Sequence, residues 1–222
     1  MIIDAGDGVE ETLNLQRKIV GLRFIIYEEE YNNLEVDEYK WKNRLCGFVS
    51  IGGKNKHFKI KKENFSCLSG PKQLGMIKHD EIESSGRVMA NCGLYSDFSI
   101  AREVSNSFNK IPQEIYGVEI GPISKVENAD VVVIIGIAEQ IMQVIQAYTY
   151  FYGVPSNTVS VGNAAMCSDL VSKPFMKNDI NLSFMCCGAR TSTASKQGEL
   201  AVGMPINIYR NVSKSILKLQ NN

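Results

Sequence analysis

The sequence is poor in histidine, the residue on which many catalytic and metal sites depend, and it has no excess of either charge. Two histidines occur in 222 residues, His57 and His79. Both lie in polar, lysine-rich surroundings, where a surface position is expected. A Ser-His-Asp triad or a histidine-rich zinc site would need these two residues, so neither is expected. Lys plus Arg and Asp plus Glu each total 24, which gives no general attraction to nucleic acid or to an anionic membrane.

Common cofactor and redox motifs are also missing. The sequence has no Gly-x-x-x-x-Gly-Lys-Ser/Thr loop and no Gly-x-Gly-x-x-Gly, so the usual phosphate cradles are excluded. No Cys-x-x-Cys occurs, which disfavours thioredoxin-like chemistry and a simple zinc ribbon. The apolar runs at 130–137 and 141–152 are too short or too interrupted to span a bilayer, and the N-terminus does not resemble a secretory signal. We therefore expect a cytoplasmic protein.

The composition that remains is that of a globular protein, with 44% hydrophobic and 22% charged residues. We expect a single domain over residues 1–222, of the α/β class, with a mixed sheet and flanking helices. The β-branched run Val131–Ile135 is typical of a strand covered on both faces. The helix expected at Ala138–Tyr152 has an apolar stripe. Strand and helix together predict a central strand and the start of a crossover unit.

The remaining predicted elements come from apolar periodicity and from turn residues. Helices are expected at Val9–Ile19, at Tyr95–Phe108 and, after Pro205, at Ile206–Leu217, and strands at Leu22–Tyr27, His57–Ile60, Tyr116–Ile120, Thr158–Val161, Asn181–Met185 and Leu200–Val202.

The two halves of the chain have similar cysteine patterns. Cys46 and Cys67 lie 21 residues apart, and Cys167 and Cys186 lie 19 apart. Further matches pair Asn64–Cys67 with Asn181–Cys186, and Leu74–Met76 with Val202–Met204. The pattern suggests a degenerate duplication, with related halves at 15–110 and 111–218 and one cysteine pair in each.

The sequence also resembles a known family over about residues 15–218. The matching signatures include Arg44-Leu45-Cys46, Asn64-Phe65-Ser66-Cys67-x-x-Gly70, Gln140-Ile141-Met142, Cys167-Ser168-Asp169, Cys186-x-Gly188-x-Arg190 and Glu199-Leu200. These residues resemble domain-of-unknown-function family 169, which is common in archaea and anaerobic bacteria. The family usually has an acidic residue where this chain has Ala189. The resemblance implies a unit of this size and no particular reaction.

Four cysteines fall on positions that match the family: Cys46, Cys67, Cys167 and Cys186. Cys92 does not. In a reducing compartment these cysteines are expected to be free thiols or metal ligands. Four thiolates from two related halves would suit an iron–sulfur cluster or another thiolate-bound metal, and a pseudo-two-fold axis would bring both pairs to one site. A reactive or redox thiol, and simple packing of small side chains, remain open alternatives.

Three charged residues are candidates for binding a ligand beside these cysteines. Arg44 and Arg190 could lower thiol pKa values or hold an anion, with Glu199 as a nearby carboxylate, and surface ion pairs are the alternative. Because Gly188 allows a tight turn, we expect Arg190 to point into the same cavity as Cys186. Asp169 is a further carboxylate near the motif, or a helix cap.

The sequence therefore favours a protein that binds a metal, an iron–sulfur cluster or a small anionic ligand at the junction of the halves. One alternative is a cysteine-dependent enzyme acting on a small anionic metabolite. Another is a small-molecule binder whose cysteines only pack. The expected partner is a metal or a small molecule, with no nucleic acid and no membrane. The sequence identifies no catalytic residue and does not decide between a monomer and a homo-oligomer.

Overall fold

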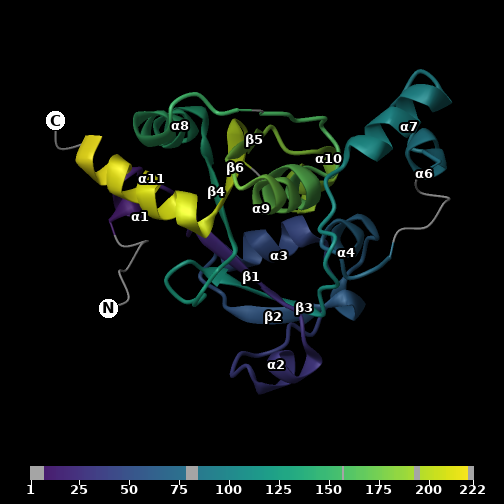
Figure 1. Cartoon of the computed structure of the whole chain (residues 1–222), viewed down its shortest axis with the longest axis horizontal. Coiled ribbons are helices and arrows are strands. Elements are labelled where there is room, and N and C mark those ends of the chain that lie inside the picture. Colours follow the sequence, from purple (N-terminus) through teal and green to yellow (C-terminus); the bar gives the residue numbers. More distant parts are fainter. Residues whose placement is uncertain (1–7, 79–84, 157, 193–195, 220–222) are drawn as a thin grey trace.

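One six-stranded sheet organises the chain (Figure 1). The computed structural model describes residues 8–78, 85–156, 158–192 and 196–219. The strands lie in the order β2-β3-β1-β4-β6-β5, and all the pairings between them are antiparallel. The α/β class is confirmed. The expected mixed sheet with a crossover unit is wrong, because β4 runs antiparallel to both of its neighbours, β1 and β6.

The strands are β1 Val20–Ile25, β2 Phe58–Lys61, β3 Gly117–Pro122, β4 Val131–Ile137, β5 Asn181–Ser183 and β6 Glu199–Pro205. The helices are α1 Val9–Thr12, α2 Glu28–Asn33, α3 Leu45–Gly52, α4 Ser69–Gln73, α6 Arg87–Ala90, α7 Phe98–Ser107, α8 Ala138–Tyr152, α9 Lys173–Lys177, α10 Cys187–Ser192 and α11 Ile206–Leu219, with a 3-10 turn η1 at Lys62–Asn64 and a π-helix η2 at Ala165–Ser172. In the part of the chain that the structure describes, no helix has both the length and the apolar character needed to cross a bilayer.

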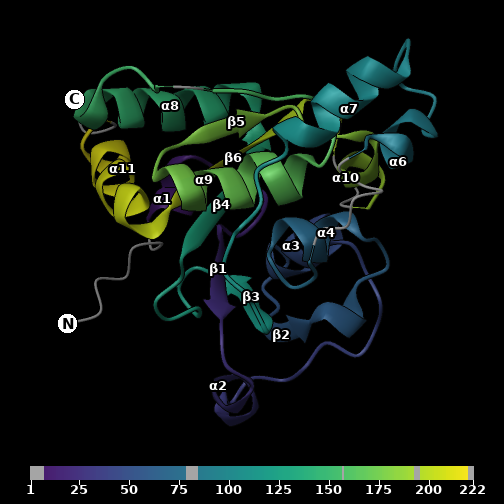
Figure 2. The same ribbon diagram turned by 45° about the vertical axis from the view of Figure 1, so that its right-hand side comes forward.

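Strand β4 lies inside the sheet and is buried on both faces, as its sequence predicts. Val131 and Val133 face a core that also contains residues of α3 and η2. Val132 and Ile134 face a second core, which contains residues of α8 and α11. Figure 2 shows α8 and α11 on one side of the sheet and α3, α9 and α10 on the other, while α6 and α7 lie together at the periphery. Alternate side chains of the strand thus pack against two layers of helices, one on each face of the sheet.

The strand order is symmetric about the β1–β4 pair. Each strand of one half of the sheet has a counterpart at the same place in the other half: β1 corresponds to β4, β2 to β5 and β3 to β6. This order fits two related units that meet at the β1–β4 pair, and it would place β3 in the first unit, whereas the expected boundary placed it in the second. The structure does not support one of the sequence matches between the halves, that of Leu74–Met76 with Val202–Met204. Gly75 takes a φ of 77° in a turn after α4, whereas Gly203 lies within β6. The duplication itself stays a prediction.

Two local predictions differ from the structure for identifiable reasons. The first helix ends at Thr12, because the chain turns at Asn14, which takes a φ of 51°. The segment Thr158–Val161 has no strand conformation. Its main chain at Val159 pairs with the side-chain amide of Asn181, which donates to the Val159 carbonyl and accepts from the Val159 N–H, both at 3.0 Å.

The histidine prediction also needs a correction. His57 is only partly exposed, and its Nε2 lies 2.7 Å from a carboxylate oxygen of the buried Glu119 on β3. A buried carboxylate needs such a partner, which explains why this histidine does not lie free on the surface. His79 lies outside the described residues.

Candidate functional site

The four family-matching cysteines lie at or beside the beginnings of four helical segments on one face of the sheet. Cys46 is in the first turn of α3, Cys67 precedes α4, Cys167 is in η2, and Cys186 precedes α10. Helix α3 packs against both η2 and α10, and α4 packs against η2. The fold therefore gathers segments that are up to 140 residues apart in the sequence.

One hydrogen bond connects the segments of Cys46 and Cys186, and a second lies within the Cys186 segment. The Cys46 thiol lies 3.7 Å from the carbonyl oxygen of Gly188, which is the second residue of α10. The backbone N–H of Ala189 donates to Sγ of Cys186 at 3.4 Å. Cys46 and Cys167 belong to the same apolar core, with Cys186 packed against it. Segments from both expected halves therefore contribute thiols to one region.

We call these four residues the cysteine cluster (Cys46, Cys67, Cys167 and Cys186). The pKa of Cys167 is affected by all three of the other thiols. Burial raises the pKa of the Cys167 thiol well above its usual range, and the neighbouring thiols of Cys67, Cys46 and Cys186 raise it further. A hydrogen bond with Ser69 acts in the opposite direction. The three thiols that act on Cys167 belong to segments that α3 and η2 bring together.

The six cysteines differ in exposure, and all are free. Cys46 and Cys167 are buried, and Cys67 and Cys186 are half-buried, so the cluster reaches the surface on one side. Cys92 and Cys187 are exposed. Cys92 lies just after α6, where its thiol donates to the carbonyl of Val88. The structure thus separates Cys92 from the cluster.

The cluster is not arranged for a single metal ion. Within the described ranges, no three or more His, Cys, Asp or Glu residues form a group that could hold one ion. One tetrahedral ion with bonds of about 2.3 Å to sulfur requires ligand sulfurs about 4 Å apart. The ligand sulfurs of an iron–sulfur cluster surround a larger body and lie farther apart. A single ion would therefore require the thiols to move.

The π-helix that carries Cys167 is held against β6 at unusually short range. It begins after Ala164, which takes a left-handed φ of 47°. A Cβ atom added at Gly203 on β6 would lie only 1.9 Å from the carbonyl oxygen of Leu170. π-Helical turns are uncommon in proteins, and those that occur are often at functional sites. The periodicity of apolar residues does not reveal this π-helix, so the sequence does not predict it.

A buried polar network supports the same helix. Asp169 accepts hydrogen bonds from the hydroxyls of Ser183, at 3.1 Å, and Ser160, at 3.3 Å. Nζ of Lys173 donates to the side chain of Asn181 at 3.0 Å. Burial raises the pKa of Asp169 to about 6, and the two serines and Lys173 partly oppose this effect. Asp169 therefore ties η2 to β5 and does not cap a helix.

Arg44 lies beside the cluster. It precedes α3, and its side chain is exposed. A Cβ atom added at Gly188 would lie 2.8 Å from Nη1 of Arg44 and 3.9 Å from Sγ of Cys186. The guanidinium thus rests against the glycine backbone, next to the half-buried thiol.

Arg190 and Glu199, the other two predicted ligand-binding residues, have different surroundings. The Arg190 guanidinium donates to the carbonyl oxygens of Phe184, at 2.8 Å, and Glu199, at 3.3 Å. It therefore joins α10 to the start of β6. The buried carboxylate of Glu199 pairs with Arg17 through two contacts of 3.0 Å. Burial opposes ionisation of Glu199, but the bonds from Arg17 and from the Lys196 N–H prevail and lower its pKa.

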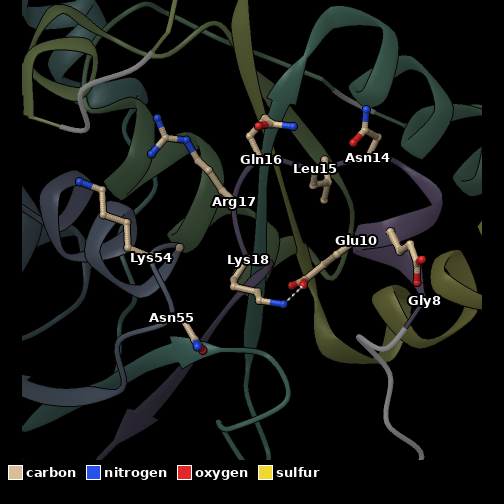
Figure 3. Close-up of a pocket in the computed structure, with 11 residues that line it drawn as sticks. Gly8, Glu10, Asn14, Leu15, Gln16, Arg17, Lys18, Lys54 and Asn55 are labelled. Atoms are coloured by element: carbon tan, nitrogen blue, oxygen red, sulfur yellow. Dashed lines mark hydrogen bonds and ion pairs between the residues drawn. The ribbon is translucent and has the colours of Figure 1, made fainter.

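A separate cavity of about 580 Å³ lies at the other end of α3 (Figure 3). It is lined by residues of the α1 region and by the turn after α3, namely Gly8, Glu10, Glu11, Asn14, Leu15, Gln16, Arg17, Lys18, Gly53, Lys54 and Asn55. Its charged side chains are largely paired, because Lys18 contacts Glu10 at 2.6 Å and Arg17 turns to Glu199. The residues of this cavity form no sequence motif, so the sequence does not predict it.

Comparisons with known proteins give a family and nothing further. The sequence profile of domain-of-unknown-function family 169, described as Uncharacterised ArCR, matches residues 9–215. Neither a curated protein nor a solved structure matches the chain. The matched range contains the whole cysteine cluster, together with Arg44, Arg190 and Glu199. The chain therefore belongs to domain-of-unknown-function family 169.

Proposed function

We propose that the protein binds an iron–sulfur cluster, or another thiolate-bound metal centre, through Cys46, Cys67, Cys167 and Cys186. The observation that carries the proposal is that the four segments bearing these cysteines pack together, with Cys46 and Cys167 in one core and Cys186 against it. Cysteine thiolates are the usual ligands of iron–sulfur clusters and of soft metal ions.

Electrostatics supports a cation at this position. In the absence of a cation, burial and neighbouring thiols both disfavour the charged form of Cys167. A bound metal inverts this relation, because a coordinating thiol loses its proton and its negative charge is neutralised. If the cysteines only packed as small apolar residues, no such grouping would be required. Because no group among the described residues is arranged to hold one ion, the proposal names an iron–sulfur cluster first.

This proposal also bears on the cellular compartment. Thiolate ligands must stay reduced, and the six cysteines form no disulfide in the structure. We place the protein in the cytoplasm, where thiols are kept reduced.

The test is anaerobic purification of the full chain, with quantification of iron, acid-labile sulfide and zinc and with visible absorption spectra. We expect iron and sulfide, with sulfur-to-iron charge-transfer absorption. Replacing any one of the four cluster cysteines with serine should remove most of the metal. Cys92→Ser and Cys187→Ser are the matched controls, and they should retain it. Metal-free wild-type protein, or equal metal loss in the controls, would refute the proposal.

A second candidate is a cysteine-dependent enzyme with Cys186 as its nucleophile. The favouring observation is that Cys186 is half-buried and accepts a hydrogen bond from the Ala189 N–H. The thiolate is the reactive form of a cysteine nucleophile. Rapid alkylation of Cys186 alone, in a protein that never holds metal, would favour this candidate over the first.

A further inference from the structure

We propose that Arg44, lying over Gly188, forms an anion-accepting subsite at the solvent-facing edge of the cysteine cluster, beside Cys186. The ligand class is a small molecule with a carboxylate or another oxyanion. The inference uses the cysteine cluster of the proposed function but does not depend on its occupation by a metal.

The Arg44 side chain differs from that of Arg190 in its hydrogen bonds. In the part of the chain that the structure describes, no hydrogen bond or ion pair is found for its guanidinium; only its backbone is engaged, where the N–H donates to Oδ1 of Asn43 and the carbonyl oxygen accepts from the N–H of Phe48. Arg190 is different, because its guanidinium is occupied by two carbonyl oxygens of its own fold. Of the two arginines beside the family cysteines, Arg44 is therefore the one with donors available to a ligand. A guanidinium offers a planar fork that matches an oxyanion.

Gly188 leaves room for the Arg44 guanidinium beside α10. The added Cβ atom would lie 2.8 Å from Nη1 of Arg44, a separation that would force the guanidinium to shift. Glycine therefore permits the close approach of the cation to the backbone of α10. The same Cβ position lies 3.9 Å from Sγ of Cys186, so the guanidinium and the thiol border the same small region.

The proposed subsite is accessible from solvent. Arg44 is exposed, and Gly188 and Cys186 are half-buried, whereas Cys46 and Cys167 are buried. A ligand arriving from solvent therefore meets Arg44 and Cys186 before the rest of the cluster. An anion held there would lie next to Cys186 and at the open side of any metal centre.

The test compares the alkylation of Cys186 by iodoacetate, which is an anion, with its alkylation by neutral iodoacetamide. In both reactions the thiolate sulfur forms a bond to the methylene carbon as iodide leaves. The full chain is used in its chelated, metal-free form, and modification at Cys186 is followed by peptide mass spectrometry. The ratio of the two rate constants reports the local attraction of an anion and cancels general changes in thiol reactivity.

We expect Arg44→Gln to lower the iodoacetate-to-iodoacetamide ratio about two- to fivefold, as loss of one exposed opposite charge should. Arg44→Lys should retain most of the ratio, and Gly188→Ala should lower it by displacing the guanidinium. Lys42→Gln removes a positive charge from the same segment, and Arg190→Gln removes the other candidate arginine. Both should leave the ratio unchanged. Circular dichroism and thermal unfolding establish that each variant is folded.

An unchanged ratio in Arg44→Gln, or an equal fall in Lys42→Gln, would overturn the inference. A fall in Arg190→Gln alone would assign the anion to the other arginine and would overturn it as well. Failure here is distinguishable from failure of the proposed function, which is measured by metal content in wild-type protein and in the cysteine variants. Loss of the Arg44 effect with metal retained refutes only the subsite, and a metal-free protein with the effect intact refutes only the metal centre.

Discussion

The guanidinium of Arg17 and the carboxylate of Glu199, 182 residues apart, form a two-contact ion pair with both N–O distances at 3.0 Å. Both side chains are nearly buried, with exposed fractions of 10% and 4%. Arg17 also donates to Ser50 on α3 at 3.3 Å. The pair thus connects the chain before β1, the start of β6 and helix α3, which carries Cys46 at its other end.

We expect Glu199→Gln to lower the free energy of unfolding by about 3 kcal/mol, because it leaves the buried cation of Arg17 without a counter-charge. The matched control is Glu10→Gln, which removes a carboxylate that pairs with the half-exposed Lys18. That change should cost less than about 1 kcal/mol. Urea denaturation measures both values. Equal losses would show that the Arg17–Glu199 pair has no special weight.

The same pair predicts a dependence of stability on pH. The pKa of Glu199 is lowered in the folded protein from 4.5, despite burial, by its bonds with Arg17 and Lys196. A lowered carboxyl pKa contributes stability that is complete above the unfolded value and is lost as the pH falls through the folded value. The stability difference between wild type and Glu199→Gln should therefore be constant near neutral pH and shrink below about pH 4.5. A difference that stays constant under acid conditions would contradict this origin.

Two glycine-to-alanine substitutions, one of them a control, test the close packing of the π-helix against β6. In Gly203→Ala the new methyl group would meet the Leu170 carbonyl at 1.9 Å, and neither backbone can move without disturbing its element. We expect a loss of at least about 3 kcal/mol, measured by urea unfolding. Gly53→Ala is the control, since its nearest neighbours lie at an ordinary 3.5 Å and its φ is −62°. That substitution should be neutral or slightly stabilising.

The exposure of the cysteines predicts an order of alkylation by iodoacetamide in metal-free protein. Cys92 and Cys187 should react first, Cys67 and Cys186 next, and Cys46 and Cys167 only as the chain opens. Cys167 should be the slowest, because burial and the neighbouring thiols raise its pKa and leave little thiolate. A time course by peptide mass spectrometry measures the order. Modification of Cys167 as fast as that of Cys92 would contradict the burial of the cluster.

Much of the fold could be predicted where a local pattern determines it. The continuous apolar run of β4 indicated burial on both faces, and the stripe of α8 indicated a helix packed on the sheet. Strand direction could not be predicted in this way, because an antiparallel neighbour such as β6 is chosen by tertiary packing and not by the sequence of β4. The missing strand at 158–161 shows the same limit, since one distant side chain, Asn181, replaces a strand partner there.

The candidate site shows a similar division. The spacing of the cysteines and the family resemblance singled out four cysteines whose segments pack together in the fold. They could not distinguish Arg44 from Arg190, because each arginine stands close to a cysteine in the sequence. Only the fold shows that Phe184 and Glu199 occupy Arg190 with main-chain oxygens. Likewise, the partner of Glu199 lies near the opposite end of the chain, so no local pattern reveals that this carboxylate is already paired.

The last prediction concerns metal removal. If the cysteine cluster holds a metal centre, binding favours the folded state alone, because only folding brings the four segments together. Chelating the metal from anaerobically purified protein should then lower the melting temperature by roughly 5–10 °C, which corresponds to about 2.7 kcal/mol of binding linkage in a chain of this size. Cys187→Ser should show the same fall, since its thiol is exposed and outside the cluster. Cys167→Ser should melt at the same temperature with and without chelator, because it lacks the central ligand. A wild-type melting temperature that chelation leaves unchanged would mean that the four thiols hold nothing that stabilises the fold, and the cluster would then be explained by packing alone.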